Sequence, residues 1–210
     1  MKASLCLSGQ PVPTSGDAPG KKPRRSFDRD TGVIAAKALF HEHGYDAVGI
    51  ADLTRVLDIN PPSLYAAFGS KAGLFGRCIK NYVEEVNLPV DRILSENKLL
   101  SDAIYDLFIT AAKQYAKSPR QRGCMVTEGM RADDPQARSQ ARSQARSLAS
   151  KYGNSIANYI EQYIQRHCPS RARELSDFVV TTLRGLSAAA QLGLPKIRLL
   201  AVAKLAGESF

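Results

Sequence analysis

Apolar residues recur at helical spacing along the chain, most regularly between residues 50 and 71. Three of them, at intervals of three and four, share one face of a first short helix: Ile50, Leu53 and Leu57. After a break, Leu64 and Phe68 repeat the pattern four residues apart, and Ile59 stands between the two groups as the apolar plug of a turn. The pattern predicts two short amphipathic helices joined by a tight turn.

The second of these helices has a clear start and an outer face without charge. Pro61 and Pro62 occupy its first turn, where a missing N–H costs little, and Asn60 precedes them as the expected N-cap. Its outward residues are small or able to form hydrogen bonds, so they can approach a base edge closely: Pro62, Ser63, Tyr65, Ala66 and Ala67. This arrangement is typical of a helix-turn-helix, whose second helix enters the DNA major groove.

The flanks extend the pattern on both sides. Residues 30–45 read as an amphipathic helix, with Ile34, Ala38 and Phe40 expected toward the core and Gly44 as the stop. The string Ala-Leu-Phe…His-Gly-Tyr-Asp-Ala…Ile-Ala-Asp-Leu…Ser-Leu-Tyr-Ala-Ala-Phe-Gly-Ser-Lys…Leu-Phe carries the spacing through a fourth helix. Over roughly residues 27–80 the chain resembles the tetracycline-repressor (TetR/AcrR) family of transcriptional regulators.

Two positions depart from that family's pattern. Asp58 stands where the turn commonly has Gly, and a left-handed backbone at Asp carries some cost. Gly49 stands where a Thr or Ser commonly caps the first helix of the motif and touches a phosphate, so that contact is not expected here.

The resemblance implies an all-α protein with two domains. A three-helix DNA-binding domain over 24–71 would precede a helical effector-binding and dimerisation domain over 72–210. Residue pattern and resemblance together point to nine DNA-contacting residues: Arg24, Arg25, Asn60, Pro61, Pro62, Ser63, Tyr65, Ser70 and Lys71. Tyr65 and Lys71 are expected on phosphates, and Ser63 is expected toward the bases.

Charge agrees with a polyanionic partner. The chain of 210 residues has a formal net charge of +9, which suits nucleic-acid binding without proving it. Residues 1–23 are rich in Pro and Gly and predict a disordered arm. The arm ends in a basic cluster that is either a DNA contact or a solvated linker: Lys21, Lys22, Arg24 and Arg25.

Beyond residue 81 the pattern is helical throughout. Helices are expected over 101–117, 124–130, from Asp133-Asp134-Pro135 to about His167, over 170–192 and over 197–206. The longest contains the repeat Ala-Arg-Ser-Gln, which predicts an alanine seam beside a ridge of Arg138, Arg142 and Arg146. That ridge is read as a solvated face in preference to a second DNA site.

The last two helices are so apolar that one chain is not expected to cover them. The resemblance implies that they pair with their twins in a homodimer. The candidate interface residues are Leu175, Phe178, Val179, Thr182, Leu183, Leu186, Ala190, Leu199 and Val202.

A small apolar effector is the other implied partner, and no residue pattern identifies it. Aromatic and sulfur-containing side chains of the middle helices are candidates for its pocket, although an ordinary core uses the same residue types. They are Phe108, Tyr115, Met125, Met130, Tyr152 and Tyr159.

Four cysteines without a CxxC pair, and no secretion signal, indicate free thiols in the cytoplasm. Cys78 follows apolar residues at helical spacing and is expected in the core. A metal or oxidation sensor built from Cys124, Cys168 and His167 stays open as an alternative to effector sensing.

No catalytic motif, nucleotide-binding glycine pattern, cofactor site or membrane-length apolar run is present in the sequence. The sequence therefore predicts a DNA-binding regulator, most simply a repressor released by an effector. A non-specific architectural DNA-binding protein is the second alternative.

Overall fold

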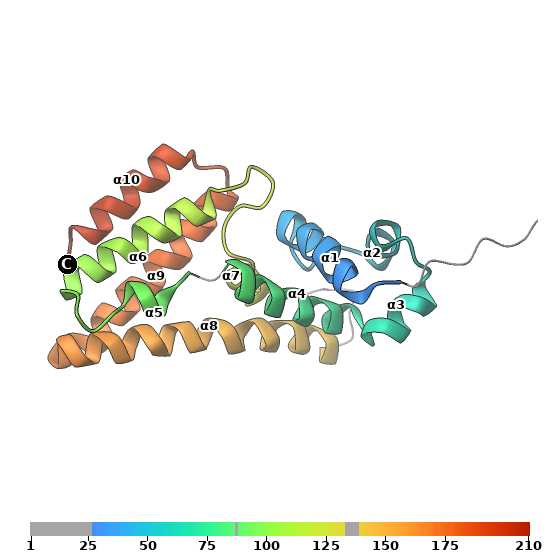
Figure 1. The fold of residues 1–210 in the computed structure, drawn as a ribbon, viewed down its shortest axis with the longest axis horizontal. Helices are drawn as coiled ribbons and strands as arrows, with labels where there is room; N and C mark the ends of the chain where they lie inside the picture. Colours follow the sequence, from blue (N-terminus) through green and yellow to red (C-terminus); the bar gives the residue numbers. More distant parts are fainter. Residues whose placement is uncertain (1–26, 87, 133–138) are drawn as a thin grey trace, which may run out of the picture.

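The computed structural model describes residues 27–86, 88–132 and 139–210, and this part of the chain is helical without a strand (Figure 1). In chain order the elements are α1 (Arg29–His43), α2 (Ile50–Leu57), α3 (Pro61–Phe68), α4 (Lys71–Val86), α5 (Val90–Ile93), α6 (Leu100–Tyr115), α7 (Met125–Gly129), α8 (Ser139–His167), the 3-10 turn η1 (Pro169–Arg171), α9 (Ala172–Gln191) and α10 (Lys196–Gly207). The all-α fold is confirmed, and the predicted helix ends lie within a few residues of these bounds.

Some expectations fall on residues outside the described part. They are the arm over 1–23, the cluster Lys21, Lys22, Arg24 and Arg25, the start of the long helix at 133–135, and the first part of the Ala-Arg repeat. Later in the repeat, Ala145 and Ala149 are fully buried, so the alanine seam is confirmed where it is described. Arg146 donates from Nε to the Ala132 carbonyl at 3.3 Å.

Helix α1 lies in a different rotational position from the predicted one. Its buried side chains are Val33, Ala36 and Phe40, whereas Ile34 is 51% exposed and Ala38 is only partly buried. Two helical faces of this helix carry apolar residues. Packing against α4 selects the face that places the large Phe40 ring against Phe75, with the ring centres 5.2 Å apart. The expectation for Ile34 was therefore wrong.

Helix α4 connects the two halves of the molecule. Leu74, Phe75 and Ile79 join the core of α1–α3, and that core continues into Met125 of α7 and Ala145 of α8. An ion pair between Lys37 and Glu85 also ties α1 to α4. The helix-turn-helix therefore rests on elements that belong to the C-terminal half.

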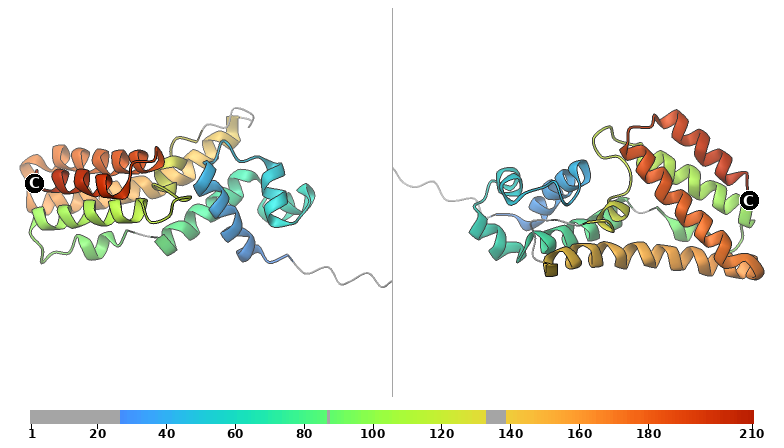
Figure 2. Two further views of the ribbon diagram at one scale, coloured as in Figure 1. Left: turned by 90° about the horizontal axis from the view of Figure 1, so that it is seen from above. Right: turned by 180° about the vertical axis from the view of Figure 1, so that it is seen from behind.

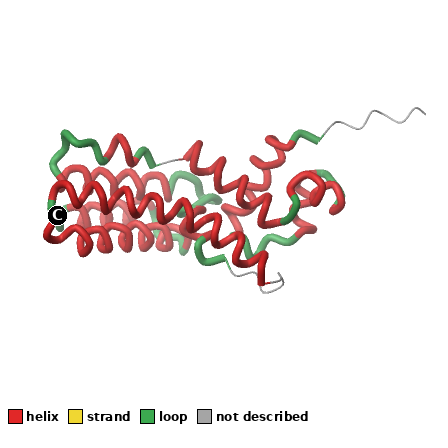
Figure 3. Tube along the Cα trace, turned by 90° about the horizontal axis from the view of Figure 1, so that it is seen from below, coloured by secondary structure: helices red, strands yellow, loops and turns green. Residues whose placement is uncertain are grey.

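The C-terminal half has a second core, built by α6, α9, α10 and the later part of α8. At 1.5 Å per residue, the 29 residues of α8 extend roughly 43 Å and run beneath both halves (Figures 1 and 2). The tube view shows the helices of the C-terminal half lying side by side, with α1–α3 at the other end (Figure 3). Among the described residues, no helix has the length and apolar character to cross a membrane.

Candidate DNA-binding interface and effector sites

The second helix of the motif is held by its inner face and leaves its outer face open. Leu64 is fully buried and Phe68 nearly so, while Ser63 is exposed and Tyr65 is 47% exposed. The Asn60 side chain accepts a hydrogen bond from the Ser63 backbone N–H at 2.9 Å, which confirms the predicted N-cap. Pro61 and Pro62 occupy the first turn and are also exposed. The outer face therefore presents small or polar groups without charge.

The two departures from the family pattern have visible structural solutions. Asp58 ends α2 in the left-handed conformation, at φ 52° and ψ 44°, so an aspartate takes the backbone geometry that Gly usually supplies. Gly49 has no side chain to cap α2, and instead its backbone N–H donates to Asp52 Oδ2 at 3.0 Å. The motif keeps its geometry without the missing hydroxyl.

The start of α4 lies beside this surface. The Ser70 hydroxyl accepts a hydrogen bond from the Gly73 N–H at 2.9 Å, so it caps the helix. Lys71 Nζ lies 4.3 Å from the centre of the Tyr45 ring. That ring holds the ammonium group near the N-terminus of α4, where free backbone amides also favour an anion.

A three-helix unit that buries one face of its second short helix and exposes the other defines the class of helix-turn-helix DNA-binding proteins. Over residues 34–78 the chain matches the family model described as bacterial regulatory proteins, tetR family. It is 42% identical over 191 residues to the HTH-type transcriptional repressor BdcR of Escherichia coli K12, covering 91% of this chain and 92% of that protein. It is also 32% identical over 101 residues to the repressor ComR of the same organism, which is 48% of each chain.

Among solved structures, a cysteine mutant of the TetR family regulator CifR, complexed with 26-base-pair double-strand operator DNA, superimposes with a TM-score of 0.75. That match has 28% sequence identity and covers 90% of this chain and 100% of the other. The chain belongs to the TetR family of bacterial transcriptional regulators. It is a DNA-binding regulator rather than an enzyme, as the sequence predicted.

The six candidate effector residues do not line one pocket. Phe108 is buried in the C-terminal core and Met125 in the core that contains α1–α3. Tyr115 and Met130 line an interior cavity of ≈ 70 Å³ together with Cys124. The remaining two, Tyr152 and Tyr159, line a separate surface groove of ≈ 290 Å³ beside Val83.

A polar cluster that the sequence did not reveal lies where the two halves meet. Burial raises the pKa of Tyr82 and of Tyr115, and the neighbouring Cys124 adds to both shifts. The Cys124 backbone N–H donates to the Ser187 hydroxyl at 2.8 Å, which fixes the start of α7 against α9. His41 packs edge-on against Tyr82, with the ring centres 5.2 Å apart. The thiol therefore lies between the helix-turn-helix support and the C-terminal core.

The structure does not bring together the three residues suggested as a metal or oxidation sensor. Cys124 lies beside α7, whereas His167 and Cys168 lie at the far end of α8 (Figure 1). The His167 Nδ1 atom lies 2.9 Å from the Tyr163 carbonyl oxygen, within its own helix. In the described ranges no group of three potential metal ligands is found. Cys78 is fully buried as expected, and burial raises the pKa of its thiol to about 12.

The stripe expected at a dimer interface is largely covered by the chain itself. Five of its members are buried in the C-terminal core: Val179, Leu183, Leu186, Ala190 and Leu199. The expectation that one chain leaves them uncovered was therefore wrong. Leu175 and Thr182 are partly buried, and Phe178 and Val202 remain exposed. Leu192, just after α9, and Ile197 and Leu205 of α10 are also exposed, and we call these five residues the apolar surface of α9 and α10.

Proposed function

We propose that this regulator is a repressor that binds a near-palindromic operator as a cytoplasmic homodimer and leaves it when a small effector binds the C-terminal half. The observation that carries the proposal is the open, uncharged face of α3 on a firmly packed support. Its relatives named as repressors, and CifR with its operator DNA, agree with this assignment. A twofold dimer places two such helices about 34 Å apart, one turn of DNA.

In this proposal Ser63 and the Pro61–Pro62 turn face the bases, while the Tyr65 hydroxyl and Lys71 hold phosphates. Asn60 and Ser70 cap the two helix starts and so orient these groups. Footprinting on the full chain should show a palindrome-sized protected site. Diffuse protection without sequence preference would favour the architectural alternative.

Matched substitutions test the phosphate contacts. Lys71→Ala should weaken binding to all sequences alike and lower the slope of log affinity against log salt by about one unit per contact. Lys80→Ala is the control, because Lys80 is exposed later on α4 beside Glu84. Tyr65→Phe should weaken binding through loss of one hydroxyl, and Tyr159→Phe should not. Lost discrimination between operator and random DNA, with affinity intact, would contradict the assignment of Lys71.

The proposed effector site is the interior cavity beside Tyr115 and Met130. Its ≈ 70 Å³ is far below the roughly 300–1,000 Å³ of ordinary ligand sites. A ligand must therefore widen it, and its free energy of binding favours the widened state over the operator-binding state. Small apolar compounds at 100 times their dissociation constant should stabilise the protein by about 2.7 kcal/mol and release operator DNA.

A pair of variants locates that site. Val180→Phe fills the interior cavity and should abolish the response to an apolar compound. Val83→Phe alters the surface groove of Tyr152 and Tyr159 and should leave the response unchanged. The reverse pattern would move the effector site to the groove.

Thiol modification at Cys124 is the second candidate for the inducing signal. Cys124 lines the same cavity and contacts the junction of the two halves, so an added oxygen or adduct would widen it as a ligand does. Mild peroxide should then release operator DNA from wild type but not from Cys124→Ser, while Cys168→Ser should respond normally. Equal release from both variants would exclude Cys124 as the sensor.

The proposed dimer surface is the exposed apolar surface of α9 and α10. Leu192 is 89%, Ile197 78% and Leu205 69% exposed, so large apolar side chains are left for a second copy to cover. Ile197→Glu with Leu205→Glu should produce monomers in sedimentation. Leu99→Glu, at an equally exposed leucine before α6, should stay dimeric. An unchanged dimer in the double variant would refute this interface.

A further inference from the structure

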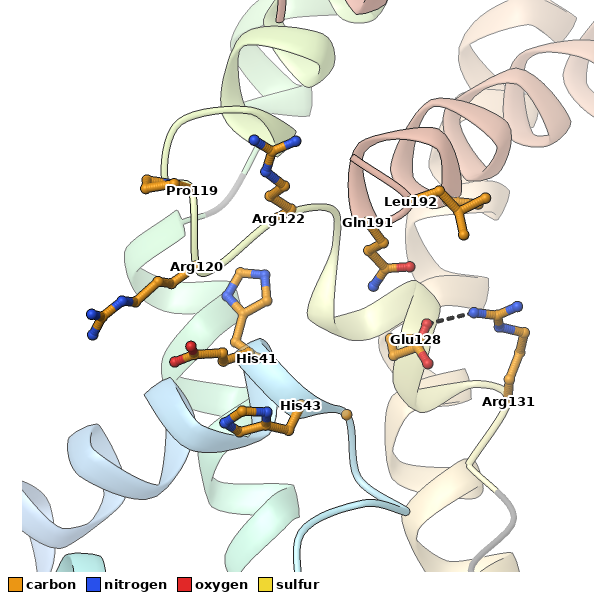
Figure 4. A pocket seen from close by; sticks show the side chains of 12 residues that line it. His41, His43, Pro119, Arg120, Arg122, Glu128, Arg131, Gln191 and Leu192 are labelled. Atoms are coloured by element: carbon orange, nitrogen blue, oxygen red, sulfur yellow. Dashed lines mark hydrogen bonds and ion pairs between the residues drawn. The ribbon is translucent and has the colours of Figure 1, made fainter. Parts of the chain in front are cut away.

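A larger cavity lies outside the interior site, in the cleft between the two halves (Figure 4). Its volume is ≈ 640 Å³, within the range of small-molecule sites. The end of α1 forms one wall with His41 and His43, and the loop between α6 and α7 forms another with Arg120 and Arg122. Glu128 of α7, Arg131 just after that helix, and the end of α9 complete the cavity.

The walls come from both functional halves. His41 Nε2 lies 3.4 Å from the Gly123 carbonyl oxygen, so the end of α1 contacts the α6–α7 loop. Glu128 reaches toward the end of α1, since a Cβ added at Gly44 would lie 3.7 Å from its Oε1 atom. A molecule held here would therefore contact the helix-turn-helix support and the C-terminal half at once.

Three arginines and two glutamates line the cleft, Glu42 among them, so its walls carry a net charge of +1 with the histidines neutral. Arg131 forms an ion pair with Glu128 at 2.5 Å, which leaves this pair neutral. Arg120 and Arg122 have no carboxylate partner among the described residues. Their guanidinium groups stand on a loop whose backbone is anchored by the buried Gly123 and by the Cys124–Ser187 hydrogen bond. Guanidinium groups bind carboxylate and phosphate oxygens through two parallel hydrogen bonds.

The same walls argue against other ligand classes. The described part of the chain offers no cluster of three potential ligands for a metal ion, although two histidines and two glutamates lie in this region. Of the twelve residues that line the cleft, six have charged or amide side chains and two are histidines, whereas mainly apolar side chains line the interior cavity. Size and charge together favour a small organic anion.

We propose that this cleft is a second ligand site, which takes a small molecule with at least two carboxylate or phosphate groups and couples it to operator binding. Arg120 and Arg122 point to different sides of the cleft, so each holds a separate acidic group (Figure 4). The regulatory effect of this site depends on the proposed operator binding. Binding of the ligand does not, because it needs no DNA.

Calorimetric titration of the full chain with citrate, and separately with pyrophosphate, tests the site at constant ionic strength set with sodium chloride. Saturable binding of at least one probe is expected, and the two arms distinguish carboxylate from phosphate recognition. The double variant Arg120→Gln with Arg122→Gln should weaken binding at least tenfold. The matched control Arg92→Gln with Arg173→Gln removes two exposed arginines elsewhere and should bind as wild type does.

Operator affinity measured with and without the bound probe then tests the coupling. A change in wild type and the control, absent in the Arg120/Arg122 variant, is expected. Failure of both probes to saturate, or equal binding by both double variants, overturns the site. Binding without any change in operator affinity overturns the coupling alone, and failure to bind operator without any ligand speaks against the proposed function instead.

Discussion

Gly123 is the residue at which backbone conformation and close packing can be separated by experiment. Its φ of +75° is left-handed, and a Cβ there would lie 2.7 Å from Gln191 Cγ and 2.8 Å from the Ser187 carbonyl oxygen. Gly193 has a similar φ of +92° but nothing within 4 Å of such a Cβ. Gly193→Ala thus measures the backbone cost alone, and Gly123→Ala measures that cost together with the collision.

The magnitudes follow from these two contributions. A left-handed L-residue costs about 1–2 kcal/mol, and forcing a methyl group into a packed site adds about 1–3 kcal/mol. At about 2–4 °C per kcal/mol for a chain of this size, Gly193→Ala should lower the melting temperature by about 4 °C. Gly123→Ala should lower it by about 10 °C.

Thermal unfolding followed by circular dichroism gives both values, provided that protein concentrations match, because a dimer melts at a concentration-dependent temperature. The two variants share the left-handed cost, so only the packing of the α6–α7 loop on α9 separates them. Melting temperatures within 1 °C of each other would show that this close approach does not hold in solution.

Three further predictions concern the core, the arm and pH. Leu64→Ala should lower the free energy of unfolding by about 2–5 kcal/mol in chemical denaturation, since Leu64 is fully buried; a loss below 1 kcal/mol would contradict that packing. Deletion of residues 1–20 should leave stability and operator affinity unchanged, whereas deletion through residue 25 should weaken binding most at low salt; truncations that match the full chain at every salt concentration would identify a plain linker. Burial lowers the pKa of His41 below its ordinary 6.5, and the charge of Lys37 lowers it further. Hydrogen bonds to the Gly123 and Arg122 carbonyls raise this pKa and so oppose the shift. The unfolded chain therefore binds the proton first, and stability should fall as pH drops below 6.5; denaturation curves of His41→Gln should show a smaller loss, and an identical pH dependence would refute the assignment.

The helix-turn-helix could be predicted because its determinants are local. Helical spacing selects the inner faces of α2 and α3, and the Asn60 cap and Pro61–Pro62 turn act within a few residues of themselves. Even the unusual Asp58 turn keeps its place, since the flanking apolar residues determine where the chain must reverse. The same local signals located α6, α9 and α10.

The tertiary structure decided which apolar face of each helix is buried and which neighbouring helix covers it. Both Ile34 and Val33 begin plausible apolar faces of α1, and only the position of α4 decides that Val33 is buried. Most of the apolar stripe of α9 packs on α6 and α10 of the same chain. Of the predicted interface residues, Phe178 and Val202 stay exposed, and Ile197 and Leu205 are exposed in addition.

The residues that meet at the junction of the two halves could not be predicted from the sequence either. His41, Tyr82, Tyr115 and Cys124 come from separate elements, and no period along the chain relates them. Periodicity reports the face of one helix at a time, whereas a cleft with Arg120 and Arg122 on one side and α1 on another exists only once the two halves are packed together.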